Sequence, residues 1–231
     1  MVSSNSLQRT FRMKVGNSVG TCFTIDIEGR QYIVTASHCL PDLGPPQSPY
    51  PIELMYQGAW MSFACLSVGA ANGNVDIAVL APPHRISPSH PLVATSHGVC
   101  LSQDVFFLGF PLGLQADLGA INNNFPLPLV KKACVSLISG GVGQDGMFLL
   151  DGHNNPGFSG GPVVFAAPPA HMAESVAAVV SAYHIDMQPV LIGGQPTGLS
   201  AQGNSGIVIA YAIDYAVALI NATPIGALLP A

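Results

Sequence analysis

DGHNNPGFSGGPV, residues 151–163, places one serine, Ser159, among three close glycines, Gly157, Gly160 and Gly161. Glycine permits an unusual backbone turn in which successive N–H groups converge on one point. The N–H groups of Gly157 and Ser159 are therefore candidate donors to an oxyanion that forms beside the serine hydroxyl. One such donor contributes about 2.7–4 kcal/mol of transition-state stabilisation. A glycine-rich hairpin without chemistry is the alternative interpretation of this stretch.

A second candidate residue is His38, in the stretch VTASHC of residues 34–39. Residues 31–36 are rich in β-branched side chains and predict a strand that ends just before the histidine. A general base needs such a place, because its backbone is held rigidly while its ring faces a cleft. The chain has seven histidines, so this one carries little weight alone.

A third candidate residue is Asp76, in the stretch VDIAVL of residues 75–80, which predicts an apolar strand. A carboxylate in such surroundings is costly unless hydrogen bonds compensate it. Asp76 could simply cap the preceding Asn72-Gly73-Asn74 turn, a position that suits aspartate well. Alternatively, it orients a histidine and stabilises the protonated imidazole.

Together the three stretches resemble the chymotrypsin/trypsin-like serine peptidases, especially compact bacterial and HtrA-like members. TASHC matches the histidine motif of that family, VDIAVL its aspartate motif and PGFSGGPV its serine motif, in the same chain order. The resemblance covers about residues 15–221. It implies a serine endopeptidase with His38, Asp76 and Ser159 as the catalytic groups and Gly157 and Ser159 as the oxyanion hole. A catalytically silent binding module on the same fold is the alternative, since fold does not guarantee function.

The resemblance also implies an all-β fold of two six-stranded antiparallel β-barrels with a short C-terminal helix. The whole chain, 1–231, is expected to be one peptidase domain, with an N-terminal barrel at about 15–90 and a C-terminal barrel at about 98–221. Abundant turn residues (25 glycines, 20 prolines) independently favour many short strands. The last strands are predicted at residues 175–183 and 207–213, followed by a helix at 215–220.

The substrate-binding residues implied by the resemblance are His153, Ser181 and Tyr183. Ser181 is expected to hydrogen-bond Asp76, and Ser181 and Tyr183 to offer main-chain groups to a substrate strand. His153 is expected at the base of the specificity pocket, where it could favour an acidic or polar side chain, or it could be an exposed loop residue. Because no carboxylate stands there, arginine or lysine is not expected. The bulky residues expected in the pocket walls suggest a small or medium apolar side chain.

One position departs from the trypsin-like pattern. Phe158 stands where trypsin-like zymogens carry an aspartate before the serine. That aspartate receives a new N-terminus after activation cleavage, and a phenylalanine cannot form this ion pair. Activation by insertion of a new N-terminus is therefore not expected.

Composition limits the partners of the chain. The net charge is −5, and Lys131-Lys132 is the only cluster of basic residues. The chain therefore lacks the basic patch that nucleic-acid binding requires. The expected partner is a protein or peptide substrate, and the mechanism requires no cofactor or metal. Neither a signal peptide nor a membrane span is visible. Composition leaves open the oligomeric state and whether the protein is cytoplasmic or secreted after processing.

The five cysteines are Cys22, Cys39, Cys65, Cys100 and Cys134, without a CxxC pair. An odd count in a chain of this length is not typical of a disulfide scaffold. Small buried hydrophobic residues are the expected role for all five. A single bridge between Cys22 and Cys39 remains open.

Overall fold

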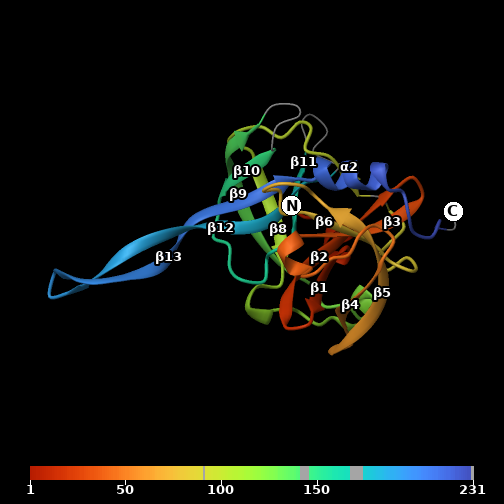
Figure 1. Cartoon of the computed structure of the whole chain (residues 1–231), viewed down its shortest axis with the longest axis horizontal. Coiled ribbons are helices and arrows are strands. Elements are labelled where there is room, and N and C mark those ends of the chain that lie inside the picture. Colours follow the sequence, from red (N-terminus) through yellow and green to blue (C-terminus); the bar gives the residue numbers. More distant parts are fainter. Residues whose placement is uncertain (91, 141–145, 167–173, 230–231) are drawn as a thin grey trace.

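The computed structural model describes residues 1–90, 92–140, 146–166 and 174–229. Two β-barrels lie side by side, and a long two-stranded arm projects from the second one (Figure 1). None of the helices in these ranges is long and apolar enough to span a membrane.

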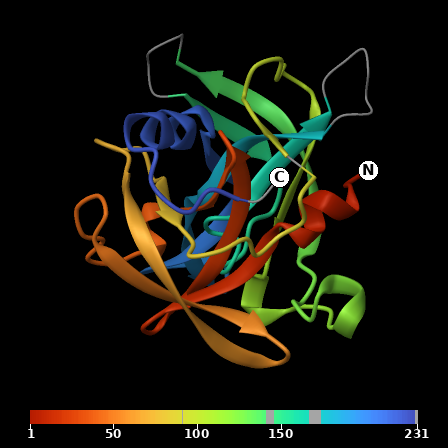
Figure 2. The ribbon, with the colours of Figure 1, turned by 90° about the vertical axis from the view of Figure 1, so that its right-hand side faces the viewer.

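The first barrel is closed and antiparallel, with neighbours in the order β1-β2-β3-β6-β5-β4. Its strands are β1 (Thr10–Val15), β2 (Ser18–Ile27), β3 (Arg30–Thr35), β4 (Pro49–Tyr56), β5 (Ala59–Ala70) and β6 (Ala78–Ala81). The β2–β3 hairpin turns at Glu28-Gly29, which both have positive φ. Figure 2 shows this barrel at the lower left, with β4 and β5 on its outer side.

The second sheet also closes, because β11 pairs with both β8 and β12. Its strands are β7 (Val93–Ala94), β8 (Asp104–Gly109), β9 (Leu129–Ser139), β10 (Met147–Asp151), β11 (Pro162–Ala166), β12 (Glu174–Ile192) and β13 (Gln195–Ala212). Six of these strands form the antiparallel ring, which confirms the predicted fold class. The short strand β7 lies outside the prediction and pairs in parallel with β12 at Ser175 and Val176.

Two α-helices within the described ranges accompany the barrels. Helix α1 (Ser4–Gln8) precedes β1, and Ser3 caps its N-terminus by accepting a hydrogen bond from the N–H of Ser6. Helix α2 (Asp214–Ala222) follows β13 and confirms the predicted C-terminal helix, with one or two more residues at each end.

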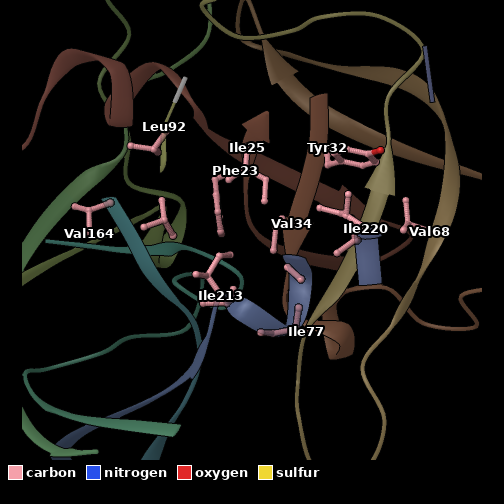
Figure 3. Packing of buried hydrophobic residues seen from close by; sticks show 14 of the residues in the cluster. Phe23, Ile25, Tyr32, Val34, Val68, Ile77, Leu92, Val164, Ile213 and Ile220 are labelled. Atoms are coloured by element: carbon pink, nitrogen blue, oxygen red, sulfur yellow. The ribbon is translucent and has the colours of Figure 1, made fainter. Parts of the chain in front are cut away.

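Apolar side chains from both barrels meet in one core. Phe23 and Val34 come from the first barrel, and Val164 and Ile213 from the second barrel and its last strand end (Figure 3). Ile220 of α2 packs onto the same cluster. Because this core joins the barrels, loops from either barrel are held at fixed positions along their common boundary.

The long arm is the feature that the sequence prediction missed. The predicted strands ended at residue 183 and resumed at 207, whereas β12 and β13 continue as a hairpin to a Gly193-Gly194 turn. Residues 184–206 are rich in Gly, Pro, Gln and Ser, a composition typical of loops. Pairing between the two strands, with bulges, overrides that composition.

Candidate active site

His38 lies at the rim of the first barrel. It belongs to a 3₁₀ turn, Ser37–Cys39, that follows directly after β3. Strand β3 is paired on both sides, with β2 and β6, so the turn starts from a rigid point. The His38 side chain is half exposed. The predicted place at the end of an apolar strand is thus the place that the structure gives it.

Asp76 precedes β6, which begins only at Ala78, so the strand predicted at 75–80 starts too early. Its carboxylate accepts four hydrogen bonds. Oδ1 accepts from Ser37 Oγ at 2.6 Å and from the His38 N–H at 2.9 Å. Oδ2 lies 2.6 Å from both His38 Nδ1 and Ser181 Oγ. These bonds offset the cost of a largely buried carboxylate and favour the orienting role over the turn-capping one.

The pKa values of the pair diverge for a physical reason. The hydrogen bond to Asp76 raises the pKa of His38 above its ordinary value. Burial by itself would raise the pKa of Asp76, but the hydrogen bonds from His38, Ser181 and Ser37 outweigh it and hold that pKa well below its ordinary value. Asp76 is therefore ionised at neutral pH and stabilises a proton on the His38 ring.

The loop that carries Ser159 is tied to the first barrel by Thr21 of β2. The Thr21 N–H donates to the Ser159 carbonyl at 2.9 Å, and Thr21 Oγ1 donates to the Gly157 carbonyl at 2.7 Å. Gly160 has a φ of +82°, and a Cβ there would lie 2.1 Å from the Thr21 carbonyl oxygen. Only glycine fits at this close approach of the two barrels.

The turn before Ser159 leaves two N–H groups open. Gly157 has a φ of +107°, and the preceding Pro156 carbonyl accepts from the N–H of Leu112 at 3.0 Å. In a trans peptide the C=O and N–H lie in one plane and point in opposite directions, so the Gly157 N–H points away from Leu112. No acceptor for the N–H of Gly157 or Ser159 is found among the residues that the structure describes.

His38 and Ser159 line one cleft of about 340 Å³. In this state Ser159 Oγ donates to the Ser181 carbonyl at 3.1 Å, and no hydrogen bond joins it to His38. Such looser contacts are common in active sites without substrate.

The predicted pocket residues are only partly brought together. Ser181 and Tyr183 line the cleft, together with Ala182 and Ile185 of the same strand. His153 does not line it: its side chain is exposed, and its carbonyl accepts from Lys131 Nζ at 2.6 Å. This arrangement matches the exposed-loop alternative.

Instead of His153, the next residues, Asn154, Asn155 and Pro156, line the cleft. Asn154 is buried, and its Nδ2 donates to the Ala182 carbonyl at 3.2 Å. Asn154 was missed because a single Asn in a turn-rich stretch has no distinguishing pattern. Thr21 and Ser37 were missed for a similar reason, since their roles depend on contacts with distant residues.

Phe158, directly before Ser159, is fully buried and anchors the serine loop in the core of the second barrel. Its ring packs edge-on against Phe107 of β8, with centroids 4.8 Å apart. The structure thus has a buried apolar side chain directly before Ser159.

All five cysteines are free thiols in the structure. Cys22, Cys39 and Cys65 are buried in the core of the first barrel, which is the expected role. Cys100 is exposed and Cys134 only partly buried, so for these two the expectation is wrong. The bridge left open between Cys22 and Cys39 is not formed.

Solved structures with this fold include several proteases. The Rv3671c protease from M. tuberculosis H37Rv, in an inactive form, superposes with a TM-score of 0.57 and 16% identity, over 95% of this chain and 88% of that one. The HtrA-type protease AlgW with a tripeptide gives a TM-score of 0.59 and 19% identity over 95% of this chain. The match spans 61% of AlgW. At these identities the likeness shows the fold.

The sequence itself gives the family. No curated protein matched the chain in a sequence search. A model of the trypsin-like peptidase domain family matches residues 20–167, which include all three candidate catalytic residues. The chain therefore belongs to the trypsin-like peptidase domain family, a family of chymotrypsin-fold serine endopeptidases.

Proposed function

We propose that this serine endopeptidase hydrolyses peptide bonds through His38, Asp76 and Ser159 and an acyl-enzyme intermediate. One observation carries the proposal: His38, from the first barrel, and Ser159, from the second, line the same cleft, while Asp76 bonds the far nitrogen of the His38 ring. A nucleophile, a base and a group that orients the base are the components that nucleophilic catalysis requires.

The proposed reaction follows the general mechanism of chymotrypsin-fold serine peptidases. Ser159 Oγ attacks the peptide carbonyl carbon while His38 Nε2 takes the hydroxyl proton. The N–H groups of Gly157 and Ser159 stabilise the oxyanion. The intermediate expels the amine, which receives the proton from His38. Water then attacks the acyl-enzyme, losing a proton to His38, and the acid product leaves with Ser159 restored.

A silent binding module is the second candidate function, favoured only by the missing hydrogen bond between His38 and Ser159. A fluorophosphonate probe separates the two, because it reacts only with a serine activated by its neighbours. Labelling mapped to Ser159 by mass spectrometry is the expected result. An intact protein that stays unlabelled while a control protease is labelled would favour the binding module.

The pH dependence of activity provides another prediction. His38 must be neutral to accept the serine proton, and its bond to Asp76 raises its pKa from 6.5. The proton is therefore retained to higher pH than on a free histidine, and kcat/KM rises as pH increases through the raised pKa. Initial rates between pH 5 and 10 measure the profile. A flat profile, or a midpoint below 6.5, would contradict the role of His38.

The substrate pocket is proposed to favour a small or medium apolar residue before the scissile bond. The residues that line the cleft include no carboxylate to pair with arginine or lysine. A cleavage profile of a proteome-derived peptide library measures this preference, and a profile dominated by arginine or lysine would contradict it.

A further inference from the structure

The arm continues the strand that lies beside Ser159. Ser181, Tyr183 and Ile185 line the cleft, and the same strand, β12, runs on without interruption to Ile192. Figure 1 shows the β12–β13 ribbon projecting far beyond the barrel from this point. Any edge that β12 offers to a substrate therefore extends well past the cleft.

One edge of β12 is covered by β13, and the other is open. The carbonyls of His184 and Val190 accept hydrogen bonds from the β13 side chains Ser205 Oγ and Thr197 Oγ1, so between these two residues the even-numbered positions direct their backbone groups toward β13. The bulge between Val180 and Ala182 shifts the alternation, so even-numbered Val180 faces the opposite edge. Backbone direction alternates along a strand. The N–H and C=O of Tyr183, Ile185 and Met187 accordingly lie on the opposite edge.

Within the described ranges no strand pairs with that opposite edge beyond Val180, although the Ser181 carbonyl accepts a hydrogen bond from Ser159 Oγ. The Val180 N–H and carbonyl bond to the carbonyl of Gly161 and the N–H of Gly160, and β11 pairs with β12 only as far as Val179. The open edge ends at Pro189. This residue faces the same edge as Ile185 and Met187, but it has no N–H to donate. Usable backbone groups thus extend from Ser181 to Met187.

The side chains along this edge are apolar. Tyr183, Ile185 and Met187 share one face of β12, whereas His184, Asp186 and Gln188 share the other. The exposed fractions are 45% for Ile185 and 57% for Met187, so both are available for contact. Asp186 is the only Asp, Glu, Lys or Arg side chain among residues 184–206, so the arm offers little to pair with a charged ligand.

We propose that the open edge of β12 binds the substrate as an added antiparallel strand reaching seven residues ahead of the scissile bond. This inference rests on the proposed function. Substrate residues are counted back from the scissile bond, and the first of them lies opposite Ser181. The third, fifth and seventh substrate residues then pair with Tyr183, Ile185 and Met187. Their side chains lie on the face of the Ile185 and Met187 side chains. The substrate class is an extended, uncharged segment with apolar side chains at the fifth and seventh positions.

The test uses the full chain and a fluorescent quenched peptide whose sequence is cleaved in the proteome-derived library. Versions with seven and with three residues ahead of the scissile bond are compared. The key variant is Met187→Pro, which removes one donor from the open edge, as the natural Pro189 does two residues on. Met187→Ala, which keeps the N–H, is its matched control. Fluorophosphonate labelling of Ser159 verifies that each variant keeps an intact catalytic centre.

Wild type should cleave the seven-residue version at least about fivefold faster in kcat/KM than the three-residue version. Met187→Pro should lower kcat/KM for the long version about fivefold relative to Met187→Ala and leave the short version within about twofold. In the library, Ile185→Ser should abolish the apolar preference at the fifth position. Ile192→Ser, on the other face of the same strand, should not.

Two results would overturn the inference alone: rates independent of peptide length, or equal rates for Met187→Pro and Met187→Ala, in an enzyme that still labels at Ser159. A dimer in light scattering that Met187→Pro dissociates would assign the edge to a second copy and also overturn it. An unlabelled wild type that cleaves no peptide would overturn the proposed function and this inference together.

Discussion

Replacing Ser159 by alanine is expected to lower kcat by about 10⁴–10⁶-fold, the largest effect of any single substitution in this protein. The hydroxyl is the only group in the proposed mechanism that forms a covalent bond to the substrate. The oxyanion donors of Gly157 and Ser159 are backbone groups and persist in the variant. Steady-state rates on the quenched peptide, with fluorophosphonate labelling beside them, measure the loss.

The fold should survive this substitution. Ser159 Oγ makes one hydrogen bond, to the Ser181 carbonyl, while the loop is held by the backbone bonds to Thr21 and by buried Phe158. Ser62→Ala, at an exposed position on β5, is the matched control and should keep full activity. Undiminished hydrolysis by purified Ser159→Ala would refute the assignment of the nucleophile.

Replacing Asp76 by asparagine is expected to lower kcat by about 10⁴-fold. Each of the two carboxylate oxygens accepts two hydrogen bonds, and one of the four donors is the His38 Nδ1–H. An amide offers only one oxygen and presents N–H groups at the other position. If the amide N–H faces His38, the ring holds its proton on Nε2 and cannot accept one from Ser159. The rate on the quenched peptide measures the loss.

The pH profile distinguishes this explanation from simple unfolding. Removing the carboxylate removes the interaction that raises the pKa of His38, so the residual activity of Asp76→Asn should have its midpoint at lower pH than wild type. Asp104→Asn, at an exposed ion pair with Lys132, is the matched control and should alter neither rate nor profile. An Asp76→Asn enzyme with wild-type kcat would show that His38 acts without this partner.

The chemistry was more predictable than the architecture around it. Gly157 and Gly160 are dictated by local backbone geometry, since the turn around Ser159 gives them φ angles of +107° and +82°. The histidine and aspartate motifs are short and are read directly from neighbouring residues. Barrel strands with apolar runs were likewise predicted, because their side chains alternate into a core.

Features that depend on distant contacts were not predicted. Nothing in the local sequence of Thr21 shows that it binds the serine loop, more than 130 residues away in the chain. His153 and Asn154 are neighbours in one turn, and only the packed structure decides which of them lines the cleft. The arm has the composition of a loop, and its strands exist because each provides the other with a hydrogen-bonded partner.

By itself, the sequence determined which residues could perform the chemistry, because nucleophile, base, acid and turn glycines are identified by residue type and local conformation. The tertiary structure alone decided that His38 and Asp76 are hydrogen-bonded, that Thr21 binds the serine loop, and that β12 keeps an open edge. The physical reason is that hydrogen bonds and burial between remote segments depend on strand register and barrel closure, which local patterns do not specify.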